Sequence, residues 1–170
     1  MLGERQLIFR FRLSLVIFMT ALVVSGLTAF PLRWELDVLC GTLGVSPNPD
    51  LSTVSGLTWW VAFVRQGLRE SFGAYPFLAY GTDWLAFAHI TIAVYFIGPL
   101  MKPTSNTWVL VAGMISCGLV IPLALIAGPI RGIPFYWRLI DCSFGVFGVL
   151  PLAYCYSLSR KIRLIRAEST

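Results

Sequence analysis

Four long apolar stretches constrain this chain more than any other feature of its sequence. A helix that crosses about 30 Å of hydrocarbon needs roughly 20 apolar residues, and four segments fit that requirement: 13–30, 82–101, 107–128 and 134–159. Of the 170 residues, 57% are hydrophobic and 12% are charged, whereas soluble domains are about 45–50% apolar and about 25% charged. We therefore exclude a soluble enzyme and a disordered chain. We predict an all-α integral membrane four-helix bundle, with residues 1–170 forming a single transmembrane domain.

The Lys and Arg residues predict the orientation of the spans, because cytoplasmic loops of membrane proteins carry an excess of both. Eight of the 13 cations lie in the N-terminal segment, the short turn at 102–106 and the C-terminal tail. Both termini are therefore expected in the cytoplasm. The net charge of +5 lies at span ends rather than on one basic face, so we expect contact with anionic lipid and no nucleic-acid partner.

The first span allows two interpretations. Its basic start, apolar middle and small residues near the end are typical of a cleavable signal peptide, but its apolar run exceeds the usual length of roughly 7–15 residues, which favours a retained helix. A retained helix presents Ala21, Ser25 and Ala29 on one face, where small side chains let another helix approach closely. Gly145 and Gly148 in the fourth span favour close helix contact for the same reason.

The segment 31–81, which joins the first two spans, contains a further helical pattern. The run SPNPD at 46–50 predicts a turn. Beyond it, apolar residues recur at the spacing of an amphipathic helix: Val54, Leu57, Val61, Val64, Leu68 and Phe72. Arg65 makes this apolar run too short to span a membrane. The predicted outer amphipathic segment therefore either lies on the outer leaflet or packs only on the protein as a cap.

Ionisable residues at membrane depth are costly and raise a functional question. Several lie towards the expected outer ends of the spans, and we take them as a candidate cluster that binds a ligand or a membrane partner: Glu35, Asp83, His89, Arg131, Arg138 and Asp141. No catalytic residue is identifiable from a motif.

Most members of this cluster also have a purely structural interpretation. Asp83, in the expected first turn of the second span, would complement a helix N-terminus. Arg138 and Asp141 are three residues apart, a spacing at which they would form an ion pair. Arg131 would tether its loop or contact a lipid phosphate. His89 would pack against a neighbouring helix and form a hydrogen bond with it.

The sequence gives little support to metal or cofactor chemistry. The single histidine, His89, excludes a haem held by two histidines of one chain, and no CxxC or HExxH motif supplies a zinc ligand set. We expect no metal and no cofactor. Cys40 and Cys142 both lie towards the outer side, so a disulfide and two free thiols remain alternatives. Pro122 and Pro151 predict kinks in the third and fourth spans.

Three segments carry a resemblance to other proteins: LTAFPL at 27–32, YGTDWLAFAHI at 80–90 and GPIRGIPFYWRLIDCSFG at 128–145. They resemble segments of small, uncharacterised bacterial membrane proteins with four helices. The resemblance covers most of the chain. It implies a bacterial inner membrane but no activity, and no site residue is carried over from it.

Three functions of different classes agree with these features. The first is a non-enzymatic membrane protein that binds membrane lipid, a membrane partner or further copies of itself at the candidate cluster. The second is a small-solute or proton-coupled carrier in which His89 titrates. The third is a membrane enzyme that acts on a lipid or quinone, with His89 or an outer carboxylate as the acid or base.

Overall fold

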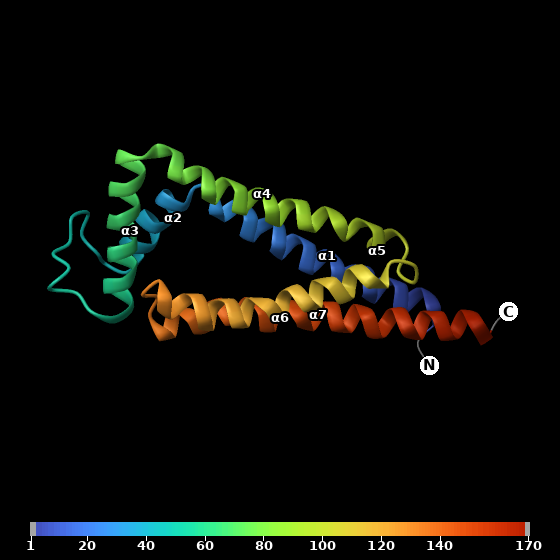
Figure 1. Ribbon diagram of the computed structural model, residues 1–170. Coiled ribbons are helices and arrows are strands. Elements are labelled where there is room, and N and C mark those ends of the chain that lie inside the picture. Colours follow the sequence, from blue (N-terminus) through green and yellow to red (C-terminus); the bar gives the residue numbers. More distant parts are fainter. Residues whose placement is uncertain (1–2, 169–170) are drawn as a thin grey trace. The chain divides into compact units, whose positions relative to one another are not determined.

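The computed structural model describes residues 3–168, and these are predominantly helical (Figure 1). In chain order the helical elements are α1 (Glu4–Ala29), α2 (Leu32–Thr42), α3 (Gly56–Ala74), the short 3-10 helix η1 (Pro76–Leu78), α4 (Ala79–Tyr95), α5 (Ile97–Met101), α6 (Thr107–Ile130) and α7 (Phe135–Glu168). No strand occurs within residues 3–168. The all-α prediction is confirmed.

Four helical segments are long and apolar enough to cross a membrane, as the sequence predicts. Their bounds are Glu4–Ala29, Pro76–Met101, Thr107–Ile130 and Phe135–Glu168. The first begins before the predicted position 13, and the last ends beyond the predicted position 159. Both helices continue because an amphipathic pattern replaces the purely apolar one: Leu7 and Ile162 are buried, while Arg10 and Lys161 are exposed.

The chain divides into two compact units, and each is described by itself. Unit 1 comprises Met1–Leu22 and Ile92–Thr170, and unit 2 comprises Val23–Thr91. The division passes through α1 and α4, so each of these helices contributes residues to both units.

The core of unit 1 forms where apolar residues of α1, α6 and α7 meet Phe96, at the start of α5. Its buried members are Leu7, Phe11, Leu15, Phe96, Leu110, Leu152, Cys155, Leu158 and Ile162. The members on α1 are four residues apart, which places them on one face of the helix. The rings of Phe18 and Phe96 meet edge to face, with their centroids 5.0 Å apart.

Glycines set how closely α6 and α7 approach each other in unit 1. A Cβ on Gly145 would overlap the backbone carbonyl oxygen of Cys117, and one on Gly148 would lie 2.9 Å from the Cys117 sulfur. The predicted role of these two glycines in close helix contact is therefore confirmed. Both helices continue as helices through Pro122 and Pro151.

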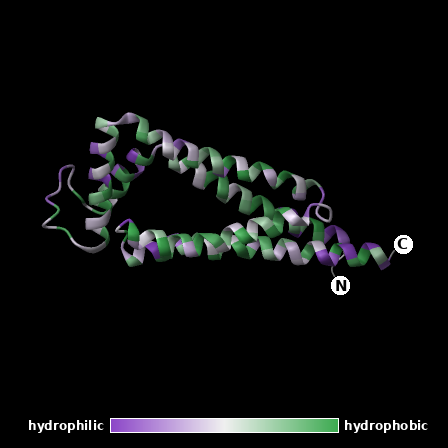
Figure 2. Cartoon of the chain, in the orientation of Figure 1, coloured by the Kyte–Doolittle hydropathy of each residue, from purple (hydrophilic) through white to green (hydrophobic). Residues whose placement is uncertain are grey.

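Polar contacts tie together three segments at one end of unit 1, where both labelled termini lie (Figure 1). Arg166 at the end of α7 lies 2.8 Å from the carboxylate of Glu4 at the start of α1, and it donates to the hydroxyl of Thr104 at 3.4 Å. Arg12 donates to the carbonyl oxygen of Leu100 at 3.3 Å, which satisfies a carbonyl at the end of α5. Figure 2 shows this end as more hydrophilic than the long middle parts of α6 and α7.

In unit 2, the last residues of α1 pack against α4 through a different residue from the predicted ones. Gly26 is buried, and a Cβ there would lie 2.9 Å from both the Ala86 carbonyl oxygen and the His89 Cβ. Ala21 and Ser25 of the predicted face are exposed instead. As the face that contacts α4, the prediction of Ala21, Ser25 and Ala29 is wrong, because at Gly26 the two helices lie too close for a side chain.

The second span also differs in detail from its prediction. It begins before residue 82, since η1 and α4 precede that position. It is then divided at Phe96 into α4 and α5. Pro99 accounts for the break, because it has no N–H to donate to the carbonyl oxygen of Tyr95 one turn earlier.

The Gly145 contact predicts a clear stability effect. We expect Gly145→Ala to lower the free energy of unfolding by about 1–3 kcal/mol, because the added methyl group meets backbone rather than a flexible side chain. Thermal unfolding in detergent, followed by circular dichroism, measures the change. Gly118→Ala is the matched control on α6, since nothing lies within 4 Å of its Cβ position; it should leave stability unchanged or raise it by up to about 1 kcal/mol. Equal effects of the two substitutions would contradict the packing described.

Candidate functional site

Arg65 of α3 is a buried cation that joins α3 to α2 and to the loop between them. Its side chain is 9% exposed, and its Nε lies 2.7 Å from Oδ1 of Asp37 on α2. Its Nη2 donates to the carbonyl oxygen of Pro47 at 2.8 Å, and its Nη1 donates to that of Ser46 at 3.4 Å. The Arg65 guanidinium thus ties the predicted turn at 46–50 to α3.

The electrostatics around Arg65 favour a permanent positive charge. The neighbouring sulfur of buried Cys40 raises the pKa of Arg65 above its ordinary value by more than burial lowers it, and the Asp37 carboxylate adds to the rise. The guanidinium therefore stays charged at every physiological pH. Cys40 is a free thiol, as are Cys117, Cys142 and Cys155.

A polar cavity of about 280 Å³ lies between the 46–50 turn and α3. Its polar walls include Asn48, Arg65, Arg69 and Glu70. Arg69 donates to the Pro47 carbonyl oxygen at 3.3 Å, and the amide of Gln66 donates to Glu70 at 2.9 Å. The two guanidinium groups and the one carboxylate of the lining are thus each engaged with another group of the protein.

A second hollow, of about 320 Å³, is lined by aromatic rings and one carboxylate. Phe30 follows α1, and Tyr80, Asp83, Trp84 and Phe87 belong to α4. The ring centroids of Tyr80 and Trp84 are 5.9 Å apart, and those of Trp84 and Phe87 are 5.8 Å apart, both pairs edge to face. Nowhere in residues 3–168 does a hydrogen bond or an ion pair engage the Asp83 carboxylate.

The structural interpretation of Asp83 given by the sequence is wrong. Asp83 does not lie in the first turn of its helix, because α4 already begins at Ala79. Thr82 does not cap that helix either, since its hydroxyl donates to the Ala79 carbonyl oxygen at 2.7 Å from within the helix. The Asp83 carboxylate therefore does not complement free backbone N–H groups.

His89 and Glu35 complete the predicted residues of unit 2. The Nδ1–H of His89 donates to the carbonyl oxygen of Leu85 at 2.8 Å, within α4 itself. The expected hydrogen bond to a neighbouring helix is wrong, because the carbonyl one turn earlier is already within reach. Glu35 is half-buried in the first turn of α2, where a carboxylate complements the helix N-terminus.

Arg131, Arg138 and Asp141 belong to unit 1. Arg131 is exposed and ends α6, where its N–H donates to the Ala127 carbonyl oxygen at 3.0 Å. The stem of Arg138 packs on Gly128, and its guanidinium lies 5.1 Å above the centroid of the Phe135 ring.

The expected ion pair between Arg138 and Asp141 is wrong, since no such pair is formed in the described part of the chain. The Arg138 side chain runs instead towards α6 and the Phe135 ring, and its buried Nε has no hydrogen-bond partner among residues 3–168. The candidate cluster thus takes three residues from each unit, and its assembly into one site stays a prediction.

The exposed aromatic face of α3 is a feature that the sequence pattern missed. Trp59 and Phe63 stack with ring centroids 5.0 Å apart, and Phe63 is 46% exposed. They lie on the side of α3 opposite buried Val61 and Arg65, since their positions differ by about half a turn. The first half of α3 is therefore apolar on both faces, and its second half carries Gln66 and Glu70 on the exposed face.

Comparison with known proteins identifies no relative: no protein-family model, no curated protein and no solved structure matches this chain. The four apolar helices agree with the membrane character of the proteins that the sequence resembles, but membership of that group is not shown. Within the described residues, no three His, Cys, Asp or Glu side chains are grouped so that they could hold a metal ion.

The Arg65 contacts predict a local loss of order. We expect Arg65→Met to lower the opening free energy of the 43–55 loop by about 2 kcal/mol, because the Pro47 and Ser46 carbonyl groups lose a charged donor and Asp37 loses its ion-pair partner. Hydrogen exchange at the Val45 amide, which donates to the Cys40 carbonyl oxygen at 2.9 Å, measures this opening; exchange should become roughly thirtyfold faster. The control is Arg69→Met, which removes one exposed contact and should change exchange little. Unchanged exchange in Arg65→Met would show that other contacts hold the loop.

Proposed function

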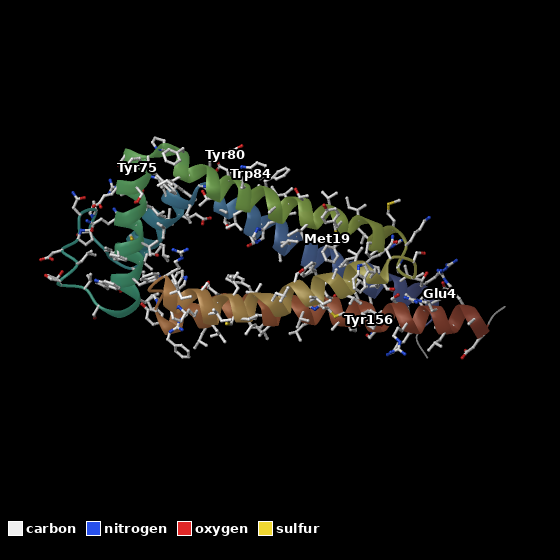
Figure 3. All side chains as sticks on the ribbon, in the orientation of Figure 1. Glu4, Met19, Tyr75, Tyr80, Trp84 and Tyr156 are labelled. Carbon is white, nitrogen blue, oxygen red and sulfur yellow. The ribbon has the colours of Figure 1, made fainter. Side chains whose placement is uncertain are left out.

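We propose that this chain is a polytopic membrane protein that binds membrane lipid through unit 2. The observation that carries the proposal is the row of exposed aromatic side chains on α3, η1 and the start of α4. Trp and Tyr side chains are enriched at the two interfaces of a bilayer, where an apolar ring and a polar group are solvated by different layers. Figure 3 shows Tyr75, Tyr80 and Trp84 following one another along this part of the chain.

The contacts of α3 support lipid as the ligand. Its buried face packs on α2 through the Arg65 contacts, so Trp59 and Phe63 remain available on the other face. An amphipathic helix at a bilayer surface places such rings at the boundary of headgroups and acyl chains. Of the two interpretations of this segment, we therefore favour the helix on the outer leaflet over a cap that packs only on the protein.

We also propose that the membrane is a bacterial inner membrane and that both termini are cytoplasmic. The excess of Lys and Arg in the terminal segments and the 102–106 turn supports this orientation. The contacts that join Glu4, Thr104 and Arg166 support a common side for these three segments. In this orientation, unit 2 binds lipid of the outer leaflet.

Lipid retention tests the proposed function. We expect the purified protein to retain phospholipid through detergent exchange, and Trp59→Ser with Phe63→Ser to reduce the retained lipid phosphorus per protein by about half, because burial of each ring in lipid contributes roughly 1.5–3 kcal/mol. Gln66→Ser with Glu70→Ser is the matched control on the polar part of the same helix and should retain as much lipid as the wild type. Equal retention by both double variants would remove α3 from the lipid-binding surface.

Labelling with a membrane-impermeant maleimide tests the orientation. In a variant without its four native cysteines, we expect Arg131→Cys to react in spheroplasts and Glu168→Cys to react only after the membrane is opened. The reason is that the two positions follow successive spans at opposite ends of α7. Reaction of both positions in intact spheroplasts would contradict the proposed topology.

A further inference from the structure

The aromatic hollow in unit 2 surrounds a carboxylate that the fold itself does not use. Asp83 is half-buried among the rings of Phe30, Tyr80, Trp84 and Phe87. The described residues offer it no hydrogen bond and no ion pair. By contrast, Arg65 and Arg69 of the same unit are engaged with Asp37 and with the Pro47 carbonyl oxygen.

This arrangement favours a cation. A carboxylate in apolar surroundings is costly unless a positive charge or hydrogen-bond donors compensate it. Aromatic ring faces attract cations as well, and a cage of such rings is the usual way in which proteins bind alkylammonium groups. Four rings and one carboxylate in a hollow of about 320 Å³ therefore match an ammonium group of modest size.

We propose that this hollow binds the ammonium group of a zwitterionic phospholipid, with ethanolamine as the preferred headgroup. The inference rests on the proposed function and names the headgroup chemistry of one lipid. A primary ammonium has N–H donors for the Asp83 carboxylate, which a fully methylated ammonium lacks.

The position of the hollow favours a lipid over a soluble amine. Asp83 lies within the apolar span Pro76–Met101. Tyr80 and Trp84 are 61% and 56% exposed, so the hollow opens on the outer surface of that span. A lipid whose ammonium group binds Asp83 can extend its acyl chains along the exposed apolar side chains of the same part of α4, which include Leu85 and Phe87.

Native mass spectrometry of the full-length protein in detergent tests this proposal, with phosphatidylethanolamine and phosphatidylglycerol of identical acyl chains as the probes. We expect the wild type to bind phosphatidylethanolamine about tenfold more tightly than phosphatidylglycerol. Asp83→Asn should remove this preference, because it keeps the shape of the side chain and removes its charge. Trp84→Leu should weaken it severalfold, because it removes one ring of the cage.

Glu70→Gln is the matched control, since it neutralises another carboxylate of unit 2 outside the hollow, and it should keep the wild-type preference. An unchanged preference in Asp83→Asn would overturn the proposal. Binding of both lipids without preference by the wild type would overturn the ammonium site and leave the proposed lipid-binding function standing, whereas binding of neither lipid would overturn both. Equally tight binding of glycerophosphoethanolamine, which has no acyl chains, would overturn the assignment to a lipid.

Discussion

The outward-facing apolar surface of the long helices is the constraint on which the rest of the structure depends. On α6, Leu119, Leu123, Ile126 and Ile130 recur at spacings of three and four and are all exposed. Exposed apolar surface costs about 25 cal/mol per Å² in water, so a helix of this kind favours hydrocarbon around it. Where hydrocarbon is the solvent, burial of apolar side chains no longer drives helices together. Other forces must then hold the helices within each unit in contact.

Close approach and local polar contacts supply those forces. In a bilayer, helices associate through tight packing and hydrogen bonds between them, because lipid tails are as apolar as a leucine side chain. Gly145 permits that approach between α6 and α7, and Gly26 permits it between α1 and α4. Arg12 adds a polar contact where α5 ends, at a carbonyl oxygen that the helix itself leaves free.

The sequence predicts the elements that hydropathy governs and misses those that depend on contacts between distant residues. The four spans follow from the apolar runs, but their ends do not, because α1 and α7 continue as amphipathic helices. The Ala21, Ser25 and Ala29 face follows from spacing alone, and the structure uses Gly26, whose lack of a side chain matters only once α4 lies against it. The pairing of Asp37 with Arg65 is not visible from the sequence, because a long loop separates the two positions.

Two carboxylates of unit 2 illustrate how a structural charge differs from one that is available to a ligand. Asp37 is half exposed, yet it lies 2.7 Å from a buried guanidinium, so its charge is compensated within the fold. Asp83 is half-buried in an apolar span, where compensation matters more, and the described chain provides none. A fold that needed Asp83 only for solubility would expose it, and one that needed it for stability would pair it. Among four aromatic rings, Asp83 is neither fully exposed nor paired. The proposed cation from outside the chain would compensate the carboxylate charge and would also be attracted by the ring faces.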